Sequence, residues 1–484
     1  MNNKELLQLL NITLSNGEID NDILIEKVET NNFNKIITLK RKSTKQYCPL
    51  CNSVMYSKGF YKRKIKHPIL QDGYNLILIV KQRKYRCTNY ECNHYLNEEF
   101  GFLEKYKQTS LITPYLILNS LKDTTNTCAS IARQYHVSDT YVHSIMMRYV
   151  DFKKLPLNKV ISIDEVFLDI EYDKRYCVII RDFINDEIID ILPNRYENTL
   201  RSFILSYSKE ERSKVEYLIS DMYKPYIQLK KYFPNAKNII DSYHVINFIN
   251  TRIRQYLNIV KRKYIKLNNY EKDDINYRTN RNHKTHKDSK ELYLLKHHDW
   301  VLFSKLENEP YISGQRFNRS LNMFVNNRQI KEMFYELDDN FKVFKELKEL
   351  YLNFNSECIN NKNKARSELI KIIKIYKESN HSIFNEFAIL LNNHFDMIIE
   401  SFTLIQKENK DGEIYYQRLS NGPIEAFNRH PKDLKRAARG FTNFDFIRNR
   451  ILWSYRKNPS VLLIPKTYNE IHKIGKKRKE YKKK

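Results

Sequence analysis

Hydrophobic positions change their spacing several times along the chain. Between residues 158 and 250, short apolar runs bounded by polar residues predict strands, and apolar residues three or four apart predict helices. Three strands come first and two more then alternate with helices: NKVISIDEVFLDI, RYCVIIRDF, EIIDILPNR, VEYLISD and AKNIID. This order predicts a mixed sheet flanked by helices, and therefore an α/β fold.

Helical spacing dominates from about residue 245 to 415, where strand signals disappear. A polar, charged stretch at residues 261–290 interrupts it and predicts a mobile loop. Upstream, residues 1–44 hold one apolar-periodic segment and one strand, and residues 110–150 are helical by pattern. The chain ends in KKRKEYKKK, which predicts a disordered basic end, and we assign residues 458–484 to a basic tail.

The segment CASIARQYHVSDTYVHSIMMRYV, residues 128–150, fits two short helices joined by a tight turn. Ser138 is placed to cap the second helix, whose apolar positions would face the core. Thr140, His143 and Ser144 would then lie on its exposed face. This arrangement suits a recognition helix that enters the major groove of DNA, although an ordinary helical hairpin has the same pattern.

The charge of the chain indicates a class of partner. Its 484 residues carry 84 Lys and Arg against 57 Asp and Glu, a formal net charge of +27. A surplus this large on a chain that is 41% hydrophobic favours a folded protein that binds a polyanion. Nucleic acid is the first candidate and an anionic membrane surface the second. The sequence has no apolar run of about 18 residues and no secretory signal, so we expect a cytoplasmic, nucleoid-associated protein without a membrane partner.

Four of the seven cysteines lie in two close pairs, and a strand-rich, hairpin-sized segment separates the pairs. They are Cys48, Cys51, Cys87 and Cys92. Such pairs can bring four thiolates onto one tetrahedral Zn²⁺, and a filled coordination sphere makes the zinc structural. The competing interpretations are four unrelated buried thiols, or His67 or His94 in place of one thiolate. We predict a zinc-ribbon-like module over residues 45–100.

Two aspartates come directly after apolar strands of the predicted sheet: Asp164 follows KVISI, and Asp221 follows VEYLIS. Their side chains can converge across neighbouring strands, although many strand-end aspartates are turn residues or helix caps. Glu425 lies in SNGPIEAFNRH, where Pro423 starts a helix that could present it to both aspartates. Three converging carboxylates repel one another. Two Mg²⁺ or Mn²⁺ ions about 3.5–4 Å apart would compensate and would support phosphoryl transfer.

Two further groups of residues lie close to these acids in the sequence. Asp241 and His244, in DSYHV, could orient metal or DNA, with packing or helix capping as the competing interpretation. A basic run after Glu425 is a candidate contact for DNA phosphates, although solvated charge is the ordinary explanation. Its members are Arg429, Lys432, Lys435, Arg436 and Arg439. Pro431, inside this run, should limit the preceding helix to roughly two turns.

Three segments resemble the catalytic blocks of bacterial insertion-sequence transposases of the ISL3 group: ISIDEVFLDI, YLISDMYKPYIQLKKYFPNAKNIIDSYHVINFIN and LSNGPIEAFNRHPKDLKRAARGFTNFDFIRNRILW. The CPLC…CTNYEC block resembles the zinc-binding domain of that group, and the helix pair lies where that group has a helix-turn-helix. The resemblance covers nearly the whole chain. It implies a DDE catalytic domain of ribonuclease H-like fold, in which Asp164, Asp221 and Glu425 are the metal-binding catalytic acids and a helical insertion separates the last two.

Together these predictions describe a multidomain α/β protein. Its expected parts are an N-terminal segment (1–44), a zinc-binding module (45–100), a helix-turn-helix domain (105–152), a ribonuclease H-like catalytic domain (158–250 and 415–457), an all-helical insertion (251–414) and a basic tail (458–484). As a homodimer or larger assembly, it would bind the terminal inverted repeats and target DNA, cut at the element's ends and join the freed 3′-hydroxyls to the target. Two alternatives stay open: a DNA-binding regulator without catalysis, and a nuclease or Holliday-junction enzyme of the same fold.

Overall fold

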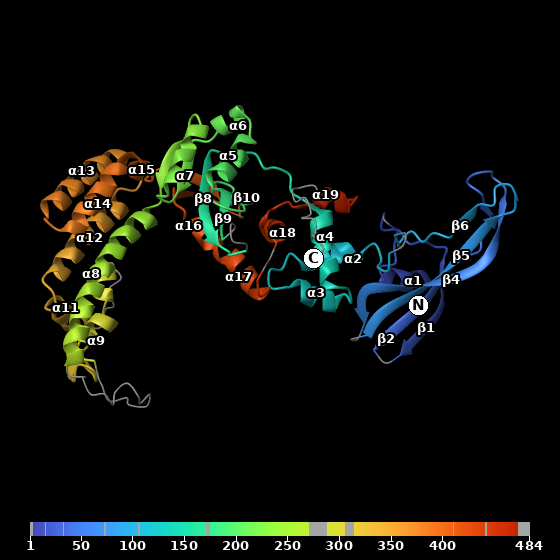
Figure 1. Ribbon diagram of the computed structural model, residues 1–484, viewed down its shortest axis with the longest axis horizontal. Coiled ribbons are helices and arrows are strands. Elements are labelled where there is room, and N and C mark those ends of the chain that lie inside the picture. Colours follow the sequence, from blue (N-terminus) through green and yellow to red (C-terminus); the bar gives the residue numbers. More distant parts are fainter. Residues whose placement is uncertain are drawn as a thin grey trace, which may run out of the picture. The chain divides into compact units, whose positions relative to one another are not determined.

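The computed structural model describes residues 3–14, 16–31, 33–71, 74–104, 107–170, 175–270, 288–304, 314–409, 411–440 and 443–472. The chain divides into two compact units, whose elements are labelled in Figure 1. Unit 1 comprises Met1–Lys154, Val166–Cys177 and Asn428–Lys484, and unit 2 comprises Leu155–Glu165 and Val178–Phe427. Residues 271–287 of the predicted loop and residues 473–484 of the predicted tail lie outside the described residues.

The sheet of unit 2 has the strand order β10-β9-β8-β11-β12. Its strands are β8 (Val160–Phe167), β9 (Tyr176–Asp182), β10 (Glu187–Leu192), β11 (Tyr217–Ser220) and β12 (Lys237–Ile240). β9 and β10 pair antiparallel, whereas β11 pairs in parallel with both β8 and β12. The prediction of a mixed α/β fold is therefore confirmed.

Each face of this sheet has its own hydrophobic core. On one face, Ile161 and Ile163 of β8 pack in a core with Leu200 of helix α5 (Glu197–Leu205). Helices α6 (Lys209–Ser213) and α7 (Lys224–Gln228) and the 3₁₀ helix η1 (Leu229–Tyr232) complete the segment between β10 and β12. On the other face, Val160 packs with Leu419. Because successive side chains of a strand point to opposite faces, Asp164 shares the face of Val160.

The rest of unit 2 is mainly helical. Its helices are α8 (Ser242–Tyr270), α9 (Lys290–His297), α10 (Trp300–Phe303), α11 (Asn327–Tyr335), α12 (Asn340–Glu357), α13 (Lys362–Glu378), α14 (Ser382–Asn393), α15 (Phe395–Glu400) and α16 (Gly422–Phe427). One hydrophobic core joins most of them.

The prediction of an all-helical insertion is wrong in detail. Two antiparallel hairpins interrupt the helices: β13 (Arg316–Asn318) with β14 (Met323–Val325), and β15 (Leu404–Glu408) with β16 (Ile414–Arg418). Strands of three to five residues are too short for a two-residue period to stand out from a helical background.

The amino-terminal part of unit 1 is a single sheet of order β1-β2-β5-β4-β3, with β6 paired to β5. Its elements are α1 (Asn3–Leu9), β1 (Ile23–Asn31), β2 (Asn34–Arg41), β3 (Gln46–Tyr47), β4 (Val54–Gln71), β5 (Tyr74–Cys87) and β6 (Tyr95–Asn97). Leu39 of β2 and Leu78 of β5 share one core. The predicted boundary at residue 44 is therefore wrong, because the parallel pairing of β2 with β5 joins both segments.

The second core of unit 1 is helical. It involves α2 (Thr113–Ser120), α3 (Cys128–Gln134), α4 (Asp139–Tyr149) and α18 (Phe444–Tyr455). Helices α17 (Arg429–Ala437) and α19 (Tyr468–His472), and β7 (Val150–Asp151) paired with β17 (Ser460–Val461), complete this unit.

Two further findings concern these helices. Residues 415–457 do not stay together as predicted, because Phe446 and Trp453 of α18 are buried against α2 and α4 in unit 1. No described helix combines the length and the apolar character that a bilayer crossing requires.

Candidate active site and metal sites

Three aspartates stand in one row across adjacent parallel strands, one within β8 and two directly after β11 and β12. Ile219 of β11 pairs with Ser162 of β8 on one side and with Ile239 of β12 on the other. Two residues beyond this paired row come Asp164, Asp221 and Asp241. Since side chains alternate between faces, these carboxylates share the face of Ile219 and Ile239. Asp164 and Asp221 therefore lie side by side on neighbouring strands, and Asp241 joins the row. The prediction that Asp164 stands at a strand end is wrong, because β8 continues past it to Phe167.

Helix α16 holds Glu425 on this face of the sheet. Asn421 precedes the helix, and its side-chain Nδ2 donates to the carbonyl oxygen of Ile163 at 3.2 Å. Arg181 of β9 donates from Nη1 to the carbonyl oxygen of Pro423 at 2.7 Å. Both contacts join α16 to strands of the sheet, so the position of Glu425 is fixed relative to β8 and β9. The helix ends at Phe427, within the limit that Pro431 predicted.

His244 extends the cluster from the first turn of α8. Its Nε2 lies 3.3 Å from Oε1 of Glu425. Asp241, His244 and Glu425 can each offer one ligand atom, and these atoms lie within 4.8 Å of one another. The backbone N–H of Tyr243 donates to Oδ1 of Asp241 at 3.3 Å. The structure therefore brings together the two auxiliary candidates and the third predicted acid.

Burial and mutual repulsion favour the protonated form of several of these acids. Burial is the main cause that raises the pKa of Asp164 to about 6, and the charges of Glu425 and Asp221 add to it. Burial also raises the pKa of Glu425, with a further contribution from Asp241. Burial raises the pKa of Asp241 as well. A site in which ionised carboxylates are disfavoured by burial and by one another fits divalent cations, which supply the missing positive charge.

The neighbouring acid, Glu165, has a different environment on the opposite face of β8. Its Oε2 lies 2.8 Å from Nη1 of Arg195 and accepts a hydrogen bond of 3.5 Å from the hydroxyl of Tyr226. Arg195 therefore balances the charge of Glu165. Successive side chains of β8 point to opposite faces of the sheet. Glu165, which pairs with Arg195, and Asp164, which has acidic neighbours, therefore lie on different faces although they are adjacent in the sequence.

The four paired cysteines of unit 1 converge as predicted. Sγ of Cys48 lies 3.6 Å from Sγ of Cys92, and Sγ of Cys51 lies 3.4 Å from Sγ of Cys87. All four sulfurs lie within 4.8 Å of one another. Tetrahedral Zn–S bonds of about 2.3 Å place sulfurs about 3.8 Å apart, so these spacings fit one zinc ion.

Local backbone geometry positions the four thiols. Asn52 and Asn93 follow the two pairs in left-handed conformations, with φ of 56° and 43°. The backbone N–H of Asn89 donates to Sγ of Cys87 at 3.3 Å. His67 is not a substitute ligand: it is buried, and its ring contacts Ser110 Oγ at 3.0 Å and the carbonyl oxygen of Leu10.

The predicted helix pair is present as α3 and α4. Ser138 caps α4, as predicted, by accepting a hydrogen bond of 3.1 Å from the backbone N–H of Tyr141. Thr140 is exposed, whereas Ser144 is half-buried and donates to the Tyr141 carbonyl oxygen at 2.8 Å. The expectation of an exposed His143 is wrong. Its ring stacks on Phe446 at a centroid distance of 4.2 Å, because α18 covers this side of α4.

The predicted basic run forms α17 and the turn that follows it. Pro431 lies in the first turn of α17, where a backbone N–H would have no helical partner. Lys435 donates from Nζ to the carbonyl oxygen of Leu168, and Arg436 pairs with Asp433 at 2.8 Å. The remaining members, Arg429, Lys432 and Arg439, are exposed.

Comparison with known proteins supplies the family. Residues 161–451 match the ISL3 family of DDE transposases, and this range runs from β8 to α18. Since the match spans more than half of the chain, the protein belongs to this transposase family. It is therefore a DNA transposase in general terms, a DDE-type nucleic-acid-processing enzyme that uses divalent metal. A comparison with curated proteins found no match.

Proposed function

We propose that this transposase cuts and joins DNA at the ends of an insertion sequence, and that Asp164, Asp221 and Glu425 hold two divalent cations for both steps. One observation carries the proposal. Asp164 and Asp221 stand in register on adjacent parallel strands, and both Asp221 and Glu425 raise the pKa of Asp164 through their charges. The electrostatic interaction of Asp164 with both other acids is what a shared metal site requires.

Each residue would have a distinct task. When bound, Mg²⁺ or Mn²⁺ ions lower the pKa of an attacking water or 3′-hydroxyl and stabilise the leaving oxygen. Asp164 and Asp221 hold ligand oxygens on the rigid sheet, and Glu425 supplies a third carboxylate from α16. His244 contacts Oε1 of Glu425 and so restricts its rotamer. Asp241 adds a fourth carboxylate, close enough to Glu425 to share a cation.

The arrangement of the sheet supports a ribonuclease H-like catalytic domain. In β10-β9-β8-β11-β12, β8 is central and carries Asp164, and parallel β11 beside it leads into Asp221. Carboxylates that lie side by side on one face of adjacent strands can receive a scissile phosphate from one direction. Since hydrolysis and joining are both in-line displacements at phosphorus, one such site can serve both steps.

Unit 1 would recognise DNA. The zinc-binding cluster, the capped helix pair and the basic residues of α17 are all within it. Thr140 of α4 is exposed at the start of the candidate recognition helix, and Arg429, Lys432 and Arg439 are exposed cations suited to phosphates. Both element ends must be held together during transposition, so we propose that a dimer or larger assembly acts.

The proposal is tested by cleavage and joining of a labelled DNA fragment that carries the element's end sequences, with Mg²⁺ or Mn²⁺. Wild type is compared with Glu425→Gln and Asp164→Asn. The matched control is Glu346→Gln, an exposed residue of α12. We expect wild type and the control to cut and join, and the two site variants to bind the ends without reaction. If neither wild type nor variants cut while all bind tightly, the protein is a regulator and the acids lose this role.

A nuclease of the same fold would cut without joining. A pre-cut end with a free 3′-hydroxyl separates the two activities, because it bypasses hydrolysis. Transfer of this end to target DNA by wild type, and its loss in Glu425→Gln, would support the transposition chemistry. Cutting of intact ends without any transfer would support the nuclease.

A further inference from the structure

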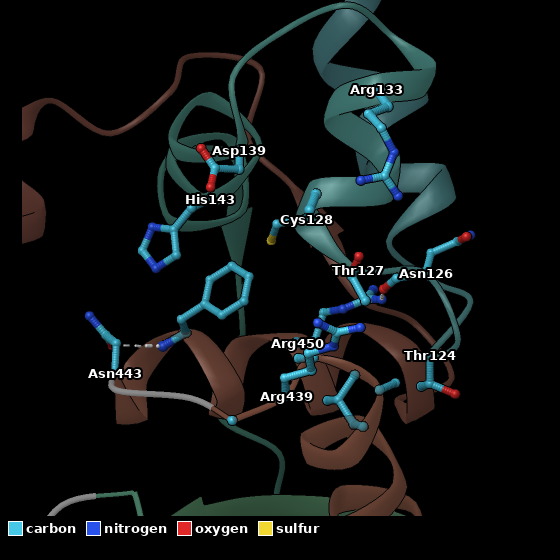
Figure 2. Close-up of a pocket in the computed structure, with 16 residues that line it drawn as sticks. Thr124, Asn126, Thr127, Cys128, Arg133, Asp139, His143, Arg439, Asn443 and Arg450 are labelled. Carbon is cyan, nitrogen blue, oxygen red and sulfur yellow. Dashed lines mark hydrogen bonds between the residues drawn. The ribbon is translucent and has the colours of Figure 1, made fainter.

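Unit 1 contains a pocket of about 620 Å³ among helices α3, α4, α17 and α18. Figure 2 shows it between the teal helices that carry Arg133 and His143 and the brown segments that carry Arg439, after α17, and Arg450, on α18. The volume is within the range of small-molecule sites, about 300–1,000 Å³. Neither the candidate active site nor the zinc-binding cluster contributes to its lining.

A buried arginine with spare hydrogen-bonding capacity lines this pocket. Arg450 of α18 is 2% exposed, and its Nη2 donates to the carbonyl oxygens of Asp123 at 2.7 Å and Asn126 at 2.8 Å. Its buried Nη1 has no acceptor among the described residues. Leaving a donor of a buried cation unpaired is costly. An anionic oxygen in the pocket would remove this cost.

Two more guanidinium groups line the pocket. Arg133 of α3 and Arg439, after α17, are exposed, and neither forms an ion pair with a described residue. Figure 2 shows Arg133 extending from α3 toward Thr127. Asp139 is the one carboxylate in the described lining. Burial lowers the pKa of His143, so this imidazole adds little positive charge at neutral pH. The lining is therefore strongly cationic.

The remaining wall is apolar. Leu434 and Ala437 of α17 and Phe446 of α18 contribute it. A site for inorganic phosphate alone would not need such a wall, whereas a nucleotide combines a phosphate with a flat, weakly polar base and a sugar. A pocket of this volume holds one nucleotide but excludes a base-paired duplex. Cationic and apolar parts of the lining thus match the two ends of a single nucleotide.

We infer that this pocket binds one unpaired nucleotide of a DNA strand, with its phosphate against Arg450, Arg133 and Arg439 and its base toward the apolar wall. The chemistry of the ligand, a nucleoside monophosphate, follows from the lining. Its source, a DNA strand rather than a free nucleotide, rests on the proposed function. An unpaired nucleotide arises where a strand end frays or a base leaves the stack, as happens around a strand break.

Binding without catalysis tests this inference. The full-length protein is titrated, without added divalent cation, into two fluorescein-labelled DNA probes. One probe is a single strand of ten nucleotides, and the other is a hairpin duplex with one end closed by the loop and the other end blunt. Fluorescence anisotropy gives both Kd values. The variants are Arg133→Ala and Arg450→Lys, and the control is Arg201→Ala, which removes an exposed helical arginine of α5. Circular dichroism checks that Arg450→Lys folds, and Arg133→Ala keeps the test valid if it does not.

We expect Arg133→Ala and Arg450→Lys each to weaken single-strand binding about tenfold, with a much smaller effect on the duplex. Arg201→Ala should change either affinity less than twofold. Deoxyadenosine monophosphate should compete with the single strand only at much higher concentration. The inference is overturned if Arg133→Ala weakens both DNA forms by the same factor, or no more than Arg201→Ala does. If the mononucleotide competes at the same concentration as the strand, the inference that the bound nucleotide belongs to a DNA strand is overturned.

These outcomes are distinguishable from a failure of the proposed function. The binding assay gives the same result whether or not the protein cuts DNA, and Glu425→Gln should bind the single strand as wild type does. Loss of cleavage with intact single-strand binding would refute only the catalytic proposal.

Discussion

Asp164→Asn should stabilise unit 2 when no divalent cation is present. Asp164 is 6% exposed, and its pKa is raised from 3.8 to about 6, mainly by burial and further by the charges of Glu425 and Asp221. Raising the pKa of this carboxyl from 3.8 to about 6 corresponds to about 3 kcal/mol of unfavourable free energy for the ionised form. Asparagine keeps the shape and carries no charge, so it should remove most of this cost.

The sign of the pH dependence follows from the raised pKa. Below pH 4 the carboxyl is protonated in folded and unfolded chains alike, so the substitution should change little. Between about pH 4 and 6 the carboxyl ionises in the unfolded chain while the buried Asp164 keeps its proton, so wild type loses stability that the variant keeps. The advantage of Asp164→Asn should therefore grow between pH 4 and 6 and stay constant above that range.

Hydrogen exchange of peptides from β8 and β11, in urea, measures the free energy of unfolding of unit 2 at pH 4 and pH 8. The control is Asp411→Asn, an exposed aspartate of the same unit. Excess Mg²⁺ should reverse the order at pH 8, because binding to the folded state stabilises wild type but not the variant. A variant that is no more stable than wild type at pH 8, or equally stabilised at pH 4, would refute the reasoning.

Substitutions elsewhere should separate the roles of the metal-binding clusters. Cys92→Ser should lose the zinc that wild type retains, whereas the control Cys128→Ser should keep it. Atomic emission measures the zinc content of each protein. Zinc retained by Cys92→Ser would contradict the four-thiolate site. His244→Asn should slow cleavage about 10–100-fold with unchanged DNA affinity, because His244 orients Glu425; an unchanged rate would contradict this. Asn421→Ala should lower the free energy of unfolding of unit 2 by about 1–3 kcal/mol, because a buried hydrogen bond is lost. Urea titration measures this free energy, and a smaller decrease would contradict the prediction.

Local patterns were sufficient to predict most elements of the sheet of unit 2. Its five strands are short apolar runs bounded by polar residues, as expected of strands buried on both faces. The cap by Ser138 was also predictable, since it depends on two residues three positions apart. The convergence of the four thiols follows from pair spacing and a hairpin, which are local as well.

Features that depend on long-range packing could not be predicted. No local signal shows that Phe446 stacks on His143, about 300 residues earlier in the chain, or that α18 belongs to unit 1. The parallel pairing of β2 with β5 is likewise invisible in residues 1–44 alone. Arg450 stands in an otherwise apolar helix pattern, and only the packing of α18 against the segment at Asp123 shows that it is buried.

The row of aspartates shows how register converts separate weak signals into one site. Each strand-end acid, taken alone, is explained equally well by a turn or a cap. Parallel pairing fixes Ser162, Ile219 and Ile239 side by side, and the acid two residues further along each strand must then share one face. Such a concentration of negative charge lowers stability without cations. The sheet order places Asp164 on the central strand β8, where burial disfavours its ionised form. The fold keeps this arrangement only if metal and substrate binding contributes more free energy than the burial of the acids costs.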